Sequence, residues 1–417
     1  MHDEPAARFS SYRWVIVSLL FFATLINYYD RIVLSVVIPF VKKELAINDI
    51  QYSYVLSLFQ CGYMFGSLLA GKVIDRLGTK LGYWLSIFFW SVAAAMHATV
   101  RSALGLAGWR GFLGLSEAGN FPAAIKSIAE WFPPRERALA TSLFNSGPHI
   151  AMITGAPIIA FVTLSLGWRW AFLALGIAGI ALAALWPFVY RTPGRTGTTL
   201  PLSGDSPQAS VPWRILLRNQ GTWGLMIARF FSDPVWWFYI FWLPEYLNSQ
   251  RGLNIREIGV AVPLIYLFAI LMGNVMGWLS GRIIQSGWNP TRTRKALMFA
   301  CAACMPFTVF AVTAHSIWAT ILLVGLACGA HTGWSANMFA LITDQFPSGA
   351  VGSVTGISTF TASVGGLLLS TVVVGYTVTY LGYLPIFILM GVLHPIAFTF
   401  IFFMVKKNRD RTEHAME

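Results

Sequence analysis

The chain has 417 residues, of which 56% are hydrophobic and only 11% are charged, whereas about a quarter of an ordinary soluble domain is charged. So much apolar surface excludes a water-soluble globular protein and indicates that lipid surrounds most of the chain. A net charge of +12 would suggest a nucleic-acid partner in a soluble protein, but here most basic residues fall in short loops between apolar runs, which argues against a polyanion site.

Twelve apolar runs are long enough to cross a membrane as helices, since about 20 helical residues span the hydrocarbon core. The runs cover residues 13–40, 51–71, 80–100, 104–128, 138–164 and 169–190, then 219–247, 256–282, 295–313, 316–343, 350–375 and 382–405. Residues 191–218 are rich in Pro, Gly, Ser and Thr and are predicted to form a loop rather than a helix. The sequence therefore predicts an all-α integral membrane protein with two six-helix bundles, residues 1–190 and 219–417, joined by a cytoplasmic linker at 191–218.

The distribution of basic residues predicts the orientation, because cytoplasmic loops carry an excess of Lys and Arg. With a cytoplasmic amino terminus, the outer loops hold Lys42, Lys43, Arg101, Arg169, Arg251 and Arg256. The apolar helices hold Arg31, Arg110, Lys126 and Arg229. All other members of the 29 basic residues then lie on the cytoplasmic side, so both termini are expected inside the cell.

The loop expected between the second and third helices has the sequence GKVIDRLGTK at residues 71–80. It resembles the G-x-x-x-D-R-x-G-R-K loop of the major facilitator superfamily of secondary transporters, and this resemblance extends over nearly the whole chain. Asp75 can accept charge-assisted hydrogen bonds at a helix end, while Gly71 and Gly78 allow a close helix approach and a tight turn. We expect Gly71, Asp75 and Arg76 to act in gating. A basic loop that only fixes topology is the alternative.

A narrower resemblance runs through the first half of the chain. Its motifs are NYYDR at 27–31, RGFLGLSEAGNFPAAIKSIAEWFPPRERA at 110–138 and GWRWAF at 167–172. Together they resemble the anion:cation symporter family, which includes bacterial hexuronate, galactonate and glucarate transporters as well as animal sialin and vesicular glutamate transporters. The resemblance implies the major facilitator fold and transport of a small organic anion.

Asp30, Arg31, Arg110 and Glu117 lie within apolar helices, where a charge costs at least a few kcal/mol unless it is paired or hydrated. Counted along their helices, Asp30, Arg31 and Arg110 have matching depths, and Glu117 lies two turns, about 10 Å, nearer the cytoplasm. These four residues are therefore expected to meet in one cavity. A salt-bridge network that only fixes helix packing is the alternative.

The four formal charges cancel when both carboxylates are ionised, which suggests a mechanism. Protonation of Asp30 and Glu117 leaves two guanidinium groups without internal partners, so that an anionic substrate becomes their counter-ion. In the family that the chain resembles, the carboxylates at the positions of Asp30 and Glu117 couple to protons, and the arginines at the positions of Arg31 and Arg110 face the substrate.

Other polar and aromatic residues within helices are weaker candidates, since many such residues only pack. Tyr63 matches a substrate-facing tyrosine of related sugar-acid transporters, and Asn27 belongs to the NYYDR motif. The further substrate-binding candidates are Asn145, His149, Trp237, Tyr239, His331, Trp334, Asn337 and Thr359. Arg229 and Asp233 are spaced to pair on one helical face as a structural ion pair.

The resulting hypothesis is a monomeric, proton-coupled importer of a small sugar acid, such as a hexuronate, aldonate or aldarate, in the inner membrane of a bacterium. No cofactor, metal ion or nucleic-acid partner is expected. An organic-anion exchanger or exporter, and a symporter of aromatic or dicarboxylic acids, remain open alternatives. A membrane enzyme or a sensor fits less well, because the sequence has no phosphate-binding loop, metal-spaced ligand set or nucleophile elbow.

Overall fold

The structure is a computed structural model that describes residues 4–132, 134–191, 213–346 and 348–405. Throughout these residues the regular structure is helical, and ten helical segments are long and apolar enough to cross a membrane. The two further spans expected from the sequence, 104–128 and 219–247, are helical as well but carry buried charged residues. The all-α membrane architecture predicted from the sequence is confirmed.

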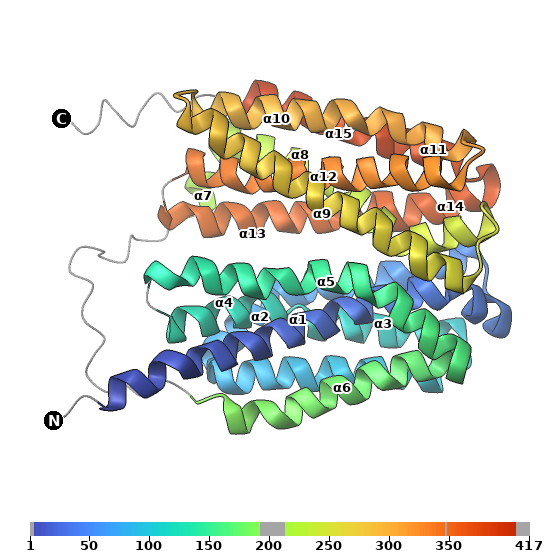
Figure 1. Ribbon diagram of the computed structural model, residues 1–417, viewed down its shortest axis with the longest axis horizontal. Helices are drawn as coiled ribbons and strands as arrows, with labels where there is room; N and C mark the ends of the chain where they lie inside the picture. The colour runs from blue at the N-terminus through green and yellow to red at the C-terminus, as the bar shows by residue number, and fades with distance from the viewer. Residues whose placement is uncertain (1–3, 133, 192–212, 347, 406–417) are drawn as a thin grey trace. The chain divides into compact units, whose positions relative to one another are not determined.

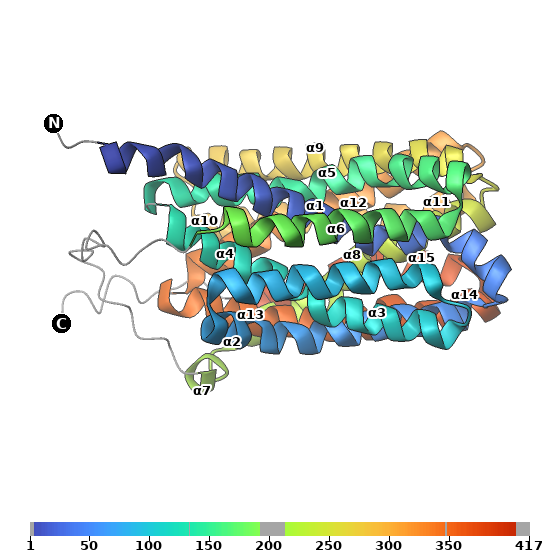
Figure 2. The same ribbon diagram turned by 90° about the horizontal axis from the view of Figure 1, so that it is seen from below.

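The chain divides into two compact units, of which the first comprises Met1–Thr198 and Ile240–Pro263. Its helices are α1 (Glu4–Leu45), α2 (Asp49–Met96), α3 (Ala103–Glu117), α4 (Asn120–Trp131), α5 (Pro134–Leu166) and α6 (Trp168–Val189), with a short 3₁₀ turn at His97–Thr99. Within this unit α1 packs on α5 and α2 packs on α3 and α6. Figure 2 shows α3 lying along α2.

The second unit comprises Thr199–Tyr239 and Leu264–Glu417. Its elements are α7 (Trp213–Leu216), α8 (Gln220–Ser249), α9 (Ile255–Gln285), α10 (Pro290–Cys304), a 3₁₀ helix (Met305–Val309), α11 (Phe310–Thr313), α12 (Ile317–Gln345), α13 (Ser348–Gly365), a π-helical stretch (Gly366–Val372), α14 (Val373–Leu381) and α15 (Leu384–Met404). Helix α10 packs against α12 and α15 (Figure 1).

Helices α8 and α9 contribute to both units. The carboxyl-terminal part of α8 and the amino-terminal part of α9, at Ile240–Pro263, cluster with the first unit. The predicted division at a linker places these residues in the second bundle, and that division stays a prediction. Residues 192–212 of the expected linker lie outside the described residues. Residues 213–216 were expected in a loop but form α7, because Trp-Arg-Ile-Leu contains neither Gly nor Pro to interrupt a helix.

The expected span at 104–128 is broken into α3 and α4 at Ala118 and Gly119. Pro122 explains the break, because a proline has no N–H to donate to the carbonyl four residues earlier, which is that of Ala118. Glu117 is therefore the last residue of α3. The break ends the regular helix directly after a buried carboxylate.

Glycines bring α2 and α3 into backbone contact. A Cβ on Gly114 would lie 2.2 Å from the carbonyl oxygen of Phe59, and one on Gly62 would lie 2.1 Å from the carbonyl oxygen of Gly111. Small residues at a helix crossing are typical of membrane proteins, where close packing replaces the hydrophobic effect between helices. This close approach places residues 59–63 of α2 directly beside the part of α3 that carries Arg110 and Glu117.

We predict that Gly114→Val lowers the melting temperature of the purified protein more than Gly108→Val does. The two glycines lie on the same helix, but a Cβ on Gly108 meets no atom of the described residues within 4 Å, so the second substitution controls for helix propensity. Forcing a side chain into a packed crossing costs about 1–3 kcal/mol. Equal melting temperatures of the two variants, measured by differential scanning fluorimetry, would contradict the close crossing.

Candidate functional site

An ion pair is buried at the centre of the first unit. Arg31, in the middle of α1, donates a hydrogen bond from Nε to Oε2 of Glu117 at 2.9 Å, and the two side chains are 2% and 0% exposed. The break after Glu117 and the glycine crossing of α2 and α3 fix where this carboxylate lies. The second oxygen, Oε1, has no hydrogen-bond partner among the described residues.

Arg110 and Asp30 complete the charge cluster, which we define as Asp30, Arg31, Arg110 and Glu117. Arg110 Nη1 donates to the backbone carbonyl of Asp30 at 2.9 Å, whereas Nε and Nη2 of Arg110 are buried without a partner in the described part of the chain. Both carboxylate oxygens of Asp30 are likewise buried and lack a hydrogen-bond partner there. The structure thus brings the four residues together, with Arg110 bonded to the backbone of Asp30 rather than to its carboxylate, and the cavity that they were expected to share stays a prediction.

Aromatic rings form the walls around the two guanidinium groups. Arg31 lies 4.6 Å from the ring centre of Tyr63 and 4.8 Å from that of Tyr28. Arg110 lies 5.8 Å from the ring centre of Phe59. Rings attract cations through their negative faces and also exclude water, so they hold the guanidinium groups without neutralising them. Tyr63 therefore lies beside Arg31, and its expected contact with a substrate stays a prediction.

Two carboxamide side chains of the first unit are fully buried with no hydrogen-bond partner among the described residues. They belong to Asn27 on α1 and Gln60 on α2, and in both the nitrogen and the oxygen are unpartnered. Buried amides are nearly always hydrogen-bonded in proteins, so two unpartnered ones point to a polar ligand or water. Gln60 was missed by the sequence analysis, although a glutamine inside an apolar run was a visible signal.

A hydrogen-bonded network at the start of α4 was also missed by the sequence analysis. Asn120 at the start of α4 donates to Thr24 at 3.1 Å, and Tyr83 donates its hydroxyl hydrogen to Asn120 Oδ1 at 2.6 Å. The three residues come from α4, α1 and α2, and they form hydrogen bonds with one another inside the unit. This network supports the break between α3 and α4 rather than offering groups to a ligand.

The candidates on α5 do not join the charge cluster. The side chains of Asn145 and His149 are exposed, and the His149 ring is hydrogen-bonded to the backbone carbonyl of Asn145 at 3.1 Å. Among the described residues, neither forms a hydrogen bond or ion pair with Asp30, Arg31, Arg110 or Glu117. Their role as substrate ligands stays a prediction.

In the second unit, Arg229 and Asp233 form the ion pair that their spacing predicted. Arg229 Nη2 donates to Asp233 Oδ2 at 2.8 Å, and Arg229 Nη1 donates to the hydroxyls of Thr359 at 2.8 Å and Ser358 at 3.2 Å. The candidate Thr359 is therefore a partner of Arg229. Unlike Arg110, this arginine has a carboxylate and two hydroxyls as internal partners.

A second buried cluster of the unit gathers around two histidines. The Nδ1 atom of His331 lies 3.2 Å from Nε2 of His394, and His331 stacks on Trp236 at 5.4 Å between ring centres. Trp334 packs edge-on against His394 at 5.2 Å, and Asn337 donates to the carbonyl of Gly333 at 2.9 Å. His394 was missed, because a lone histidine in α15 gives no spacing signal. His331 and Trp334 therefore both pack against His394.

The aromatic candidates on α8 lie on both sides of the helix. Tyr239 is fully buried and packs against Phe238 and Phe387 at 5.1 and 6.5 Å between ring centres, whereas Trp237 is half-buried. Tyr239 thus contributes to the packing of its own unit. A contact of either residue with a substrate stays a prediction.

The expected gating loop is largely helical, since α2 runs through it with a break at Gly78, whose φ of 78° requires glycine. The tight turn at Gly78 is confirmed. No atom of the described residues lies within 4 Å of a Cβ placed on Gly71, and the gating role expected of Gly71, Asp75 and Arg76 stays a prediction. Arg76 is exposed, and the side chain of Asp75 lies outside the described residues.

A second ion-pair cluster, missed by the sequence analysis, joins the ends of three helices in the first unit. Lys42 on α1 donates to Asp49 at the start of α2 at 2.5 Å and to Glu245 near the end of α8 at 2.6 Å. Tyr52 adds a hydrogen bond from its hydroxyl to the carbonyl of Phe241 at 2.8 Å. We call Lys42, Asp49 and Glu245 the Lys42 cluster. It ties the end of α8 to α1 and α2.

We predict that Glu117→Gln lowers the melting temperature more than Asp30→Asn. Removing one partner of a buried ion pair costs about 3–5 kcal/mol, because the other charge is left uncompensated. Asp30 is equally buried but has no hydrogen-bond partner to lose in the described chain, so the two amide substitutions form a matched pair. A larger drop for Asp30→Asn in differential scanning fluorimetry would contradict the pairing seen here.

Comparisons with known proteins agree with this architecture. Residues 20–370 match the model of the Major Facilitator Superfamily. The chain is 31% identical to the galacturonate transporter of Dickeya chrysanthemi over 66% of this chain and 82% of that protein, and 28% identical to the hexuronate transporter of Escherichia coli (strain K12) over 97% and 96%.

Among solved structures, a bacterial homologue of the human lysosomal transporter Spinster, in an inward-facing and unoccupied conformation, has a TM-score of 0.79 at 17% identity. The match covers 94% of this chain and 96% of that one, and at this identity it shows the fold alone. The sequence model, the relatives and the fold agree, and the resemblance to anion:cation symporters is confirmed. The chain belongs to the major facilitator superfamily of membrane transporters.

Proposed function

We propose that the chain is a proton-coupled symporter that imports a sugar acid, such as a hexuronate, aldonate or aldarate, by alternating access. The relatives reported above are named for hexuronate and galacturonate transport, which supports a substrate of this class. The observation that carries the proposal is the charge cluster. In it one arginine is neutralised by Glu117, while the other retains two buried, unpartnered nitrogens among the described residues.

Arg110 provides the first step of the mechanism. Its Nε and Nη2 have no hydrogen-bond partner among the described residues and can donate to a carboxylate, and two donors of one guanidinium match the two oxygens of a carboxylate group. The free carboxylate of Asp30 competes for the same charge while it is ionised. Protonation of Asp30 removes this competitor, and Arg110 then has only the substrate as a counter-ion.

Glu117 provides the second step through Arg31. While Glu117 is ionised, it holds Nε of Arg31 at 2.9 Å. A proton on Glu117 removes the charge of the acceptor, so that Arg31 also gains from an incoming anion. Loss of the two protons on the other side of the membrane restores the internal pairing and expels the anion. Proton binding and substrate binding are thereby coupled in the same direction.

The uncharged groups of the cluster suit a polyhydroxylated substrate. The amides of Asn27 and Gln60 supply donors and acceptors that lack internal partners among the described residues. Tyr63 and Tyr28 present ring faces beside Arg31, against which the C–H groups of a sugar can pack. The carboxylate of a sugar acid is thus matched by the arginines, its hydroxyls by the two amides, and its apolar ring face by the two tyrosine rings.

The location and assembly follow from the same proposal. The excess of basic residues in one set of loops supports an orientation with both termini in the cytoplasm, and the relatives support the inner membrane of a bacterium. We propose that one chain suffices for transport, since the four residues of the charge cluster all come from a single unit of one chain.

The function is tested by uptake of D-galacturonate into proteoliposomes with and without an imposed inward proton gradient. Wild type is expected to accumulate the anion only with the gradient. Glu117→Gln is expected to lose this accumulation but to retain exchange against internal galacturonate, because the amide binds no proton. Glu44→Gln, which removes a carboxylate of an exposed ion pair, serves as the control. Gradient-driven accumulation by Glu117→Gln would refute the coupling role.

Substrate binding at Arg110 is tested separately by thermal-shift titration at acidic pH. Arg110→Gln is expected to weaken galacturonate binding by at least about tenfold, because a hydrogen bond to a charged group contributes about 1.5–3 kcal/mol. Arg101→Gln removes a cation outside the cluster and is expected to bind as wild type does. An unchanged dissociation constant in Arg110→Gln would place the anion elsewhere.

A further inference from the structure

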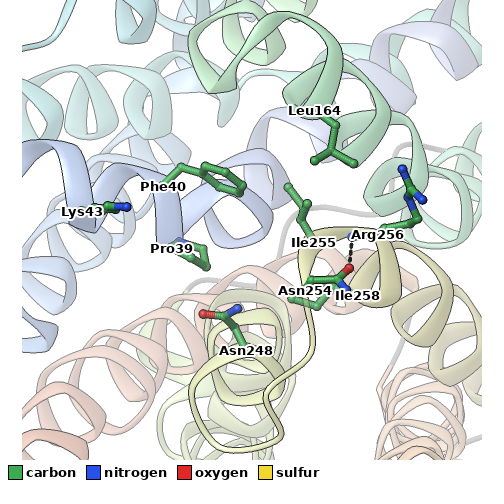
Figure 3. Close-up of a pocket in the computed structure, with 9 residues that line it drawn as sticks. All are labelled: Pro39, Phe40, Lys43, Leu164, Asn248, Asn254, Ile255, Arg256 and Ile258. Atoms are coloured by element: carbon green, nitrogen blue, oxygen red, sulfur yellow. Dashed lines mark hydrogen bonds between the residues drawn. The ribbon is translucent and has the colours of Figure 1, made fainter.

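A pocket with a volume of about 550 Å³ lies in the first unit, where the ends of α1, α5 and α8 meet the start of α9 (Figure 3). Its lining includes Phe40, Lys43, Leu164, Asn248, Asn254 and Arg256. Ligand pockets in proteins typically measure about 300–1,000 Å³ and combine apolar walls with a few polar groups. We call it the Lys43–Arg256 pocket.

The charge of this pocket is positive. Lys43 and Arg256 line it from opposite sides (Figure 3), and neither has an ion-pair partner among the described residues. The carboxylates nearby in the sequence are engaged with other groups. Glu44 pairs with Arg169, and Glu257 accepts a hydrogen bond from the backbone N–H of Asn254 at 2.8 Å. The lining itself contains two cations and no carboxylate.

The uncharged lining suits the remainder of a sugar acid. Oδ1 of Asn254 accepts from the backbone N–H groups of Arg256 and Glu257, which leaves its amide nitrogen as a donor toward a ligand. The side-chain nitrogen of Asn248 donates a hydrogen bond to the carbonyl oxygen of Leu253 at 2.8 Å, which leaves the side-chain oxygen of Asn248 as an acceptor. Phe40 and Leu164 add apolar surface on which the C–H groups of a sugar can pack.

The pocket is separate from the charge cluster. Phe40 follows Arg31 by nine residues on the same helix, which corresponds to about 13 Å along its axis. The Lys42 cluster adjoins the pocket, since Lys42 precedes Lys43 and Glu245 is three residues before Asn248 on α8. By the predicted orientation this end of α1 faces the outside of the cell.

We propose that the Lys43–Arg256 pocket is an outer anion-binding site that captures the carboxylate of the substrate before the anion reaches Arg31 and Arg110. This inference rests on the proposed import of a sugar acid. A site lined by charges of one sign raises the local concentration of oppositely charged ligands and increases association rates by about 10–1,000-fold, an effect that added salt suppresses. The pocket therefore acts on the capture of substrate and leaves the translocation step unchanged.

The first experiment measures initial uptake of D-galacturonate into phosphatidylcholine proteoliposomes at low and high salt. Lys43→Gln/Arg256→Gln is expected to raise KM about three- to tenfold at low salt, to leave the maximal rate unchanged and to lose most of the salt dependence of wild type. Arg101→Gln removes a cation from the same predicted face, outside the pocket, and is expected to match wild type. An unchanged KM in the double variant, or an equal effect of Arg101→Gln, would overturn the proposal.

The second experiment detects binding without transport, so that failure of this inference and failure of the proposed function can be told apart. Arg110→Gln protein in phosphatidylcholine nanodiscs is probed by saturation-transfer NMR with D-galacturonate and with neutral D-galactose. Weak binding of the acid alone, abolished by adding Lys43→Gln and Arg256→Gln, supports the pocket even if wild type transports no sugar acid. Binding that survives these two substitutions, or is equal for galactose, overturns the pocket.

A phosphate headgroup could engage the same two cations, so the second experiment is repeated in nanodiscs that contain phosphatidylglycerol. We expect galacturonate to bind as before. If phosphatidylglycerol abolishes its binding, and native mass spectrometry detects retained phosphatidylglycerol that is lost in Lys43→Gln/Arg256→Gln, the pocket is a lipid site and the proposal is wrong.

Discussion

A buried charge must find a counter-charge inside a protein that lipid surrounds, and the Arg31–Glu117 ion pair is where the first unit meets this requirement. The pair joins α1 to the last residue of α3, and both side chains are almost fully excluded from solvent. In a medium of low polarity such a pair is stable only while both members are ionised. Any event that changes the charge of Glu117 therefore alters the counter-ion of Arg31, and the proposed coupling of proton and anion binding rests on this contact.

Features of the backbone position the side chains that form and surround this ion pair. Glycines at the crossing of α2 and α3 allow the two helices to touch, so that Phe59 and Tyr63 on α2 reach the arginines. Pro122 interrupts the helix after Ala118, and the network of Asn120 with Thr24 and Tyr83 holds the interruption in place. Local backbone features with no charge of their own thus decide which charged groups become neighbours.

The buried arginines Arg229 and Arg110, one in each unit, differ in their hydrogen-bond partners. Arg229 of the second unit is satisfied by Asp233 and the hydroxyls of Ser358 and Thr359, as expected of a structural ion pair. Arg110 of the first unit has one backbone acceptor and two unpartnered nitrogens among the described residues. Since an unsatisfied buried donor is costly, its presence is evidence for a group that binds there during function. This asymmetry supports the proposal that the first unit binds the anion.

Composition and spacing determined the all-α membrane class, and the charged residues within apolar helices identified the members of the charge cluster, because lipid tolerates such residues only where they are paired or functional. The tertiary structure decided the close approach at Gly114 and the pairing of Arg31 rather than Arg110 with Glu117. The Lys42 cluster, Gln60 and His394 were likewise found only there. Helical periodicity fixes which side of its own helix a residue occupies, but the partner it meets depends on how separate helices cross, and no local pattern encodes that crossing.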